Sequence, residues 1–326
     1  MKRLVVFFVS VSVFLVILFV LGPKPTKPQF KEHLPLLTTP LAQIEDSLLQ
    51  FEVTTGALEC AYTEILWNDS IRQTDFAFLY LHGFSATKHE GDTFRYSLPK
   101  RYGMNALYNR MAGHGLNEAD STRMLKFTAE HAWNKVLYDF ALAKRLGKKV
   151  IIASCSTGSL LALRLALNYP EDITAIINYS PNLGLPDPNS NLLNGPWGLQ
   201  LIKALSGSNY RIVPEREDSL RVTCKPMAYS WESVVQMQHL VETAIARNDF
   251  ARIKVPVLNM VWFEDEDHQD YVINVSKARE MHDALGGYRK WVETAAKEHV
   301  VLNHQLSADL PKVYQESYNF LDGIIK

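Results

Sequence analysis

The chain has 326 residues, 47% of them hydrophobic and 21% charged, which is enough for one large α/β domain or two small ones. Its 34 Lys and Arg residues nearly balance its 35 Asp and Glu residues, so the sequence lacks the basic excess that is typical of nucleic-acid-binding proteins. The three cysteines, Cys60, Cys155 and Cys224, do not have the spacing of metal ligands. Cys60 and Cys224 could pair in an oxidising compartment, and the sequence leaves that question open.

The N-terminus carries a long apolar segment. Lys2 and Arg3 precede an uncharged run at residues 4–21, roughly the length that spans a bilayer core. A cleaved signal peptide would have a shorter apolar core and a small-residue cleavage site, and the run shows neither. Residues 1–22 therefore predict a single-pass membrane anchor, with secretion after signal cleavage as the alternative. Lys2 and Arg3 favour a cytoplasmic N-terminus, which places the rest of the chain on the extracytoplasmic (periplasmic) side.

A Pro- and Lys-rich segment, residues 23–40, predicts a stiff extended spacer, and the globular domain is expected at residues 41–326. In that domain short apolar runs alternate with helical patterns. The runs predict strands at residues 76–81, 102–108, 149–153, 173–179, 255–261 and 288–292. The patterns between them predict helices at residues 129–146, 160–169 and 274–285. This alternation indicates an α/β fold with a mostly parallel central sheet and helices on both faces.

One segment, residues 183–250, interrupts the alternation. It shows no obvious strand and predicts helices near residues 199–205 and 231–247. Because it follows the carboxyl end of a strand, we expect an inserted helical cap over the active face. Its large side chains are expected to form an apolar acyl pocket: Trp197, Tyr210, Tyr229, Trp231 and Met237.

The strand at residues 149–153 is followed at once by small residues and a helix. The pattern Ser154-x-Ser156-x-Gly158 predicts a sharp turn that presents the Ser156 hydroxyl, because a bulky side chain at either flank would clash with the strand or helix. The helix start offers backbone N–H groups to an anion beside this serine. Ser154 stands where glycine is usual in such turns. The alternative is a βα turn of small residues without chemistry.

Two further turns follow strands. His82 and Gly83 are expected to turn the chain so that the N–H of Phe84 points toward the serine, where with the Thr157 N–H it forms an oxyanion hole. An ordinary glycine turn is the alternative there. His114, in a Gly-His-Gly turn, is expected to brace loops rather than transfer protons.

The orienting acid and the base are expected after the last two strands. Asp265 lies nearest the strand end in an acidic cluster and is the predicted acid, with Asp267 and Asp270 in reserve. His299 is the predicted base because the imidazole pKa lies near neutrality, with His304 in reserve.

The order of these motifs, with the serine first, then the acid, then the histidine, resembles the α/β-hydrolase family over residues 73–326. The chain looks most like membrane-anchored or exported bacterial esterases and lipases with a helical cap. This resemblance implies the α/β-hydrolase fold and a serine hydrolase in which Ser156 forms an acyl-enzyme. His299 is then the base, Asp265 orients it, and no metal or organic cofactor is needed.

The expected substrate is a small-molecule ester or lipid. An acyltransferase or an amidase would use the same three residues, and a non-catalytic anchored binding module would use the same fold. The sequence does not separate hydrolysis from acyl transfer.

Overall fold

The computed structural model describes residues 2–119, 122–213 and 228–325. Its centre is a seven-stranded sheet of order β1-β3-β2-β4-β5-β8-β9, in which every neighbouring pair is parallel except β1 with β3. The strands are β1 Glu64–Leu66, β2 Thr74–Leu81, β3 Asn105–Tyr108, β4 Gly147–Cys155, β5 Ile173–Tyr179, β8 Val257–Trp262 and β9 Arg289–Thr294. The predicted mostly parallel sheet is therefore confirmed.

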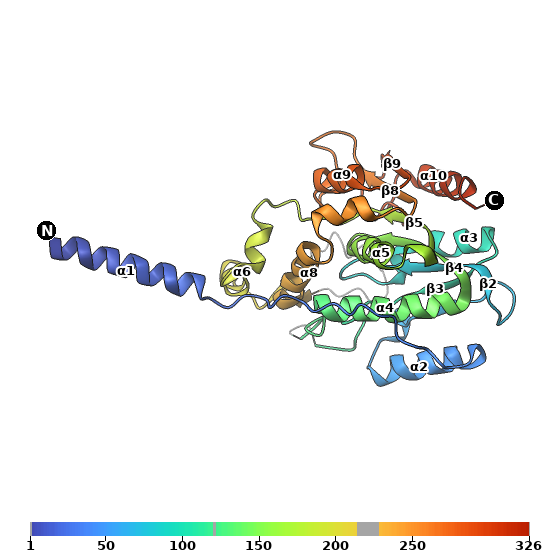
Figure 1. The fold of residues 1–326 in the computed structure, drawn as a ribbon, viewed down its shortest axis with the longest axis horizontal. Coiled ribbons are helices and arrows are strands. Elements are labelled where there is room, and N and C mark those ends of the chain that lie inside the picture. Colours follow the sequence, from blue (N-terminus) through green and yellow to red (C-terminus); the bar gives the residue numbers. More distant parts are fainter. Residues whose placement is uncertain (1, 120–121, 214–227, 326) are drawn as a thin grey trace.

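Helices cover both faces of this sheet (Figure 1). Successive side chains of a strand point to opposite faces, so Ala77 and Leu79 of β2 join one apolar cluster, while Phe78 and Tyr80 join the other. The first cluster includes side chains of α4 Ala129–Leu146, α5 Thr157–Asn168 and α9 Val275–Ala284. The second includes side chains of α3 Phe94–Arg101 and α10 Leu310–Asp322. The predicted layering is confirmed.

The predicted boundaries match best where the apolar pattern is longest. The bounds of α4 are those predicted, and its expected inward residues are all buried: Trp133, Val136, Leu137, Phe140 and Leu142. The strand predicted from residue 102 begins instead at Asn105. The chain between α3 and β3 turns at Gly103, whose φ of +62° is unsuited to an extended strand.

The segment between β5 and β8 forms the insertion, with α6 Gly198–Ser206 and α8 Trp231–Thr243 as its helices. The sequence shows no obvious strand in this segment, but the structure contains two short ones outside the central sheet. β6 Tyr210–Ile212 and β7 Ala228–Ser230 form a separate antiparallel pair, and strands this short leave little periodicity in a sequence. The second helix also ends at Thr243, four residues earlier than predicted.

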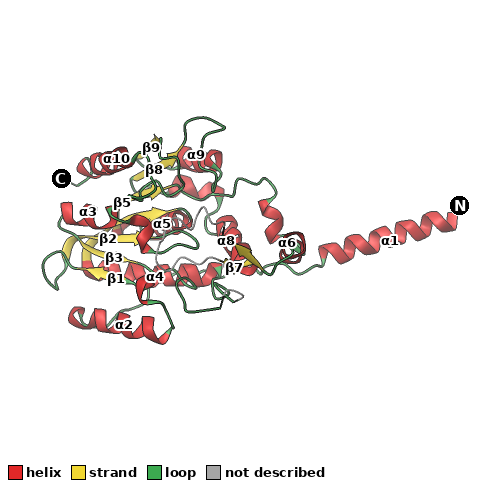
Figure 2. Ribbon diagram, turned by 180° about the vertical axis from the view of Figure 1, so that it is seen from behind, coloured by secondary structure: helices red, strands yellow, loops and turns green. Residues whose placement is uncertain are grey.

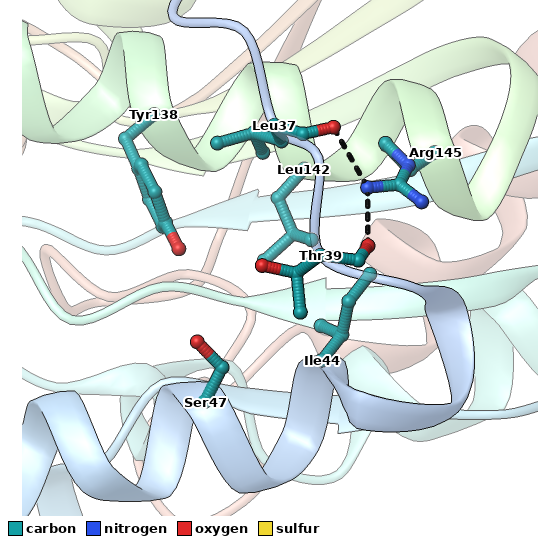
Figure 3. A pocket seen from close by; sticks show the side chains of 7 residues that line it. All are labelled: Leu37, Thr39, Ile44, Ser47, Tyr138, Leu142 and Arg145. Carbon is teal, nitrogen blue, oxygen red and sulfur yellow. Dashed lines mark hydrogen bonds between the residues drawn. The ribbon is translucent and has the colours of Figure 1, made fainter.

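The spacer, residues 23–40, does not hang free but lies along the domain. The Trp133 indole donates to Lys31 O at 2.7 Å, and the Tyr169 hydroxyl donates to Glu32 O at 2.8 Å. Arg145 donates to Leu37 O and Thr39 O at 2.9 and 2.6 Å (Figure 3). These bonds fix the spacer against α4 and against the residue that follows α5 Thr157–Asn168. A small pocket remains between it, α2 Ile44–Thr54 and α4.

The N-terminal helix α1, Lys2–Val20, is long and apolar enough to cross a membrane. It extends away from the α/β domain at the end where α6 lies, and Figures 1 and 2 show this from opposite sides. Cys60 is disulfide-bonded and Cys155 is a buried free thiol. Cys224, the partner considered for Cys60 from the sequence, lies outside the described residues.

Candidate active site

Ser156 is the single residue between β4 and α5. Its backbone has φ 51° and ψ −121°, a left-handed conformation that non-glycine residues rarely adopt and that is typical of strained functional turns. Gly158 permits the turn, because an ideal Cβ at that position would lie 2.3 Å from Leu81 O and 2.8 Å from His82 O. The sharp strand-to-helix turn that the Ser154-x-Ser156-x-Gly158 pattern predicts is therefore present.

Ser154 belongs to a buried row of polar groups beneath this turn. Its hydroxyl donates to Asn178 Oδ1 at 2.7 Å, the Asn178 amide donates to Asn259 Oδ1 at 2.9 Å, and the Asn259 amide donates to His282 Nδ1 at 2.9 Å. Ser154, Asn178 and Asn259 are registered neighbours on β4, β5 and β8. A serine is accommodated where glycine is usual because its hydroxyl has a buried acceptor.

The turn after β2 lies against the serine. An ideal Cβ on Gly83 would be 3.1 Å from Ser156 Cβ, a tight contact, so a glycine suits this close approach. Within the described part of the chain, the backbone N–H groups of Phe84 and Thr157 donate no hydrogen bond. Both are therefore available to an incoming oxygen, as an oxyanion hole requires.

Two buried histidines hold this turn. His82 donates from Nδ1 to Gly83 O at 2.8 Å and accepts the Met111 N–H on Nε2 at 2.9 Å. His114 Nε2 accepts the Ser85 N–H at 2.9 Å. Burial lowers the pKa of His82 well below its usual value, and burial lowers the pKa of His114 to about 4. Both rings are neutral near pH 7, and His114 braces two loops, as the sequence predicted.

The carboxylate that contacts His299 is Asp270, and the prediction of Asp265 in this place is wrong. Asp270 Oδ2 lies 2.7 Å from His299 Nδ1, and the two side chains are 0% and 12% exposed. Asp265 instead lies 2.8 Å from His268 Nδ1, and those two side chains are 60% and 66% exposed. Asp270 was one of the two reserves, so the sequence identified the acidic segment but not the residue.

The path of the chain explains the error. After β8 the residues form an exposed turn, in which Glu264 N–H donates to His268 O at 2.9 Å. Phe263 then pairs with Gln269 in an antiparallel bridge, and Asp270 N–H donates to Trp262 O at 3.0 Å. The chain therefore returns to the end of β8 before Asp270. Asp265 is predicted from the sequence because it lies nearest the strand end along the chain, but in the folded turn Asp265 is exposed and Asp270 is the residue that returns to β8.

Residues after β5 connect the histidine loop with the serine. The Ser180 hydroxyl donates to His299 O at 2.6 Å, and Asn182 N–H donates to Ser156 O at 3.2 Å. Ser156, the Phe84 turn, Asp270 and His299 thus all lie at the carboxyl edge of the parallel strands. The reserve base His304 lies elsewhere, with Nδ1 2.8 Å from Asp92 O.

Glu90 is a buried carboxylate at this site that the sequence did not reveal. Its Oε1 accepts the Gly83 N–H at 2.6 Å and the Tyr80 hydroxyl at 3.1 Å. Burial and the nearby Glu90 charge raise the pKa of Tyr80, and likewise that of the Cys155 thiol, well above their usual values. An acidic residue in a polar loop gives no sequence signal of burial, so only the folded chain identifies it.

The insertion reaches the site through two side chains. The Tyr229 ring lies 5.4 Å from the Phe84 ring, edge to face, and Met237 Sδ lies 3.6 Å from the amide nitrogen of Asn182, which also donates to Thr157 Oγ1. Trp197, predicted to line the same pocket, instead contacts α1. Among the described residues no group of three His, Cys, Asp or Glu side chains is placed to hold a metal ion.

Known proteins resemble this chain in structure but not in sequence. No family model and no curated protein matches the sequence. One of the metagenome-derived lipolytic enzymes LipS and LipT superposes with a TM-score of 0.62 at 16% identity, covering 82% of this chain and 99% of its own. The monoacylglycerol lipase of Paleococcus ferrophilus gives 0.57 at 16% identity, covering 80% and 97%. The enol-lactonase of Burkholderia xenovorans gives 0.54 at 16% identity, covering 80% and 96%.

Proposed function

From the premise that this chain has the α/β-hydrolase fold, we propose that it is a serine hydrolase that cleaves carboxylic esters. The observation that carries the proposal is the buried Asp270–His299 pair at the sheet edge where the strained turn presents Ser156. A carboxylate that fixes an imidazole beside a serine hydroxyl is the arrangement that activates a serine nucleophile.

The residues take the following roles. His299 accepts the Ser156 proton on Nε2 as the serine oxygen attacks the ester carbonyl carbon, while Asp270 holds the Nδ1–H side of the ring. The Phe84 and Thr157 N–H groups donate to the oxygen that becomes negative. His299 then returns the proton to the leaving alcohol, and water, deprotonated by the same ring, releases the acid from Ser156.

The structural neighbours favour an ester as substrate. Those named above are a lipolytic enzyme, a monoacylglycerol lipase and an enol-lactonase, all of which act on a carbon–oxygen bond of an acyl group. The site residues would equally serve an acyltransferase or an amidase, because the acyl-enzyme is common to all three.

The insertion, about residues 183–250, is proposed as the cap that selects the acyl chain through Tyr229 and Met237.

We also propose that α1 anchors the protein in a membrane, with the α/β domain on the extracytoplasmic side. Its 18-residue window, Arg3–Val20, has a mean hydropathy of 2.8 and no side chain of it is buried by the domain. Secretion after cleavage is the alternative. Fractionation followed by N-terminal sequencing separates the two, because a soluble product that begins after α1 would contradict an anchor.

The catalytic proposal is tested by labelling the purified full chain with a fluorophosphonate probe. We expect the wild type to be labelled and Ser156→Ala not to be, with circular dichroism showing that both are folded. Hydrolysis of p-nitrophenyl esters of increasing chain length then identifies the acyl preference. A folded wild type that neither reacts with the probe nor hydrolyses any ester would instead favour a non-catalytic binding module.

A further inference from the structure

The chain leaves α1 and immediately contacts the insertion. The Trp197 indole N–H donates to Leu18 O in the last turn of α1 at 3.3 Å, and the Trp197 backbone N–H donates to Pro23 O at 2.8 Å. An ideal Cβ on Gly22 would lie 2.0 Å from Trp197 Nε1, so the indole packs directly on the backbone there. Trp197 thereby ties the insertion to the end of the apolar helix.

Helix α6 begins at the next residue and presents apolar side chains to solvent. Leu201 and Leu205, one turn apart on the same face, are 47% and 84% exposed. Two apolar residues before and after the helix, Leu192 and Ile212, are 60% and 68% exposed. Leu201 and Leu205 therefore give α6 an exposed apolar face, and an exposed apolar surface of this kind usually marks a binding surface.

The position of Trp197 identifies what covers this surface. If α1 spans a membrane, Leu18 lies inside its apolar span, and an indole bonded to Leu18 O lies at the level of the headgroups, where tryptophan is enriched. Leu205 is eight residues further along the chain, about 12 Å of helix. The exposed leucines of α6 therefore lie within reach of the same lipid surface.

The charges in this region suit lipid headgroups. The sequence of α6, GLQLIKALS, has a lysine and no acidic residue, and the spacer adds Lys24 and Lys27 close to the end of α1. Lys203 itself is paired with Glu232 at 2.5 Å, so among the described residues the unpaired positive charge at this end comes from the spacer. Exposed leucines on an amphipathic helix beside basic residues are typical of a segment that lies in a membrane interface. The hydrogen bonds of the spacer to Trp133 of α4 and to Tyr169, just after α5, hold the domain in one orientation relative to this end of the chain.

We infer that the docking face, formed by Leu192, Leu201, Leu205 and Ile212, lies on the surface of the membrane that holds α1. The inference rests on the proposed anchoring of α1. The same insertion contacts the site through Tyr229 and Met237, so one element faces the lipid and the active site together. Given the proposed esterase activity, the substrates are esters dissolved in the lipid leaflet, which reach Ser156 past the insertion.

The docking face is tested on the full chain reconstituted into phosphatidylcholine–phosphatidylglycerol vesicles. Single cysteines at Leu205 and, as a matched control, at Leu49 carry the fluorophore NBD; Leu49 is 52% exposed on α2, away from α1. A third label at Val9, in α1, reports on the anchor, and unsubstituted chain treated in parallel gives the background. Brominated lipids then quench any fluorophore that lies within the bilayer.

We expect a blue-shifted, strongly quenched emission at Leu205 and Val9, and little quenching at Leu49. A Leu205 label quenched no more than the Leu49 label, with Val9 quenched, would overturn the docking face while leaving the anchor intact. An unquenched Val9 label would overturn the anchor and the docking face together. None of these readings depends on enzymatic activity, so a failure of the proposed function is seen separately.

A second arm measures the consequence for substrate. The double variant Leu201→Gln/Leu205→Gln is expected to hydrolyse a water-soluble p-nitrophenyl ester at the wild-type rate, while losing several-fold in rate on a long-chain ester embedded in the vesicles. If the variant hydrolysed both the soluble and the vesicle-embedded ester at the wild-type rate, the supply of substrate from the leaflet would be contradicted. Loss on both substrates by equal factors would also contradict it, because docking should not alter the site itself.

Discussion

The loop after β8 supplies the carboxylates of two carboxylate–imidazole pairs, which have similar oxygen–nitrogen distances and different surroundings. Asp265 lies 2.8 Å from His268 and Asp270 lies 2.7 Å from His299, yet the first pair is more than half exposed and the second is nearly buried. Water competes for every bond of the exposed pair and lets both side chains rotate. The buried pair has no such competition, so the carboxylate fixes the ring and its tautomer. Contact alone therefore does not distinguish a surface ion pair from an active-site pair.

The largest expected effect comes from removing the buried carboxylate. Asp270→Asn should lower kcat by about 10⁴-fold, because an amide donating to Nδ1 stabilises the wrong tautomer of His299 and cannot stabilise the imidazolium. The measurement is kcat on a p-nitrophenyl ester, and Asp265→Asn is the matched control, since it alters the exposed pair in the same loop. A wild-type rate in Asp270→Asn, with loss in Asp265→Asn, would show that the structure pairs the histidine with the wrong acid.

The acid of this site illustrates what the sequence can and cannot predict. Apolar runs predicted the strands, and the order of the motifs singled out Ser156 and His299 as candidates, because each follows a strand and strand positions are encoded locally. Asp270 depends on the Phe263–Gln269 bridge, which returns the chain to β8. Glu90 depends on Gly83 and Tyr80, whose groups it meets only after β2 and the following loop have folded. Pairings between loop residues leave no periodic signal.

Glu90 is a third carboxylate at the site, and its substitution tests whether a buried carboxylate can affect catalysis by positioning the backbone beside Ser156. We expect Glu90→Gln to lower kcat by about 10²-fold with little change in KM, because the acceptor that holds the Gly83 N–H also sets where the Phe84 N–H points. Glu171→Gln, an exposed carboxylate, is the matched control. A rise in KM without a fall in kcat would assign Glu90 to substrate binding instead.

The buried imidazole of His114 gives a smaller effect, which is expected in the free energy of unfolding rather than in kcat. The folded-state pKa of His114, about 4, lies below that of a free histidine, so the unfolded chain binds more protons as the pH falls from 6.5 toward 4. The stability contributed by neutral His114 is complete above pH 6.5 and decreases below it. Between pH 7.5 and pH 5, the protonation of His114 in the unfolded chain should lower the free energy of unfolding by about 2 kcal/mol.

Urea unfolding of the wild type and His114→Gln at pH 7.5 and pH 5 measures this contribution. The variant is expected to be less stable at pH 7.5 but to lose less stability on acidification, and His131→Gln, near the start of α4, is the control. An identical acid loss in His114→Gln and the wild type would show that other groups account for it.

The smallest effect is expected from the exposed pair, and its sign is opposite. The Asp265 hydrogen bond raises the pKa of His268 above its usual value, so any stability from this pair is present below pH 6.5 and is lost as the pH rises through the folded-state pKa. Both side chains are solvated and screened by salt, so we expect His268→Gln to keep kcat within about twofold and Tm within about 1 °C at physiological salt. Scanning calorimetry at pH 5.5 and pH 8, in low and high salt, measures the difference. If His268→Gln instead impairs catalysis as severely as Asp270→Asn, the exposed turn must close over the site during turnover, and exposure in the free protein would no longer separate the two pairs.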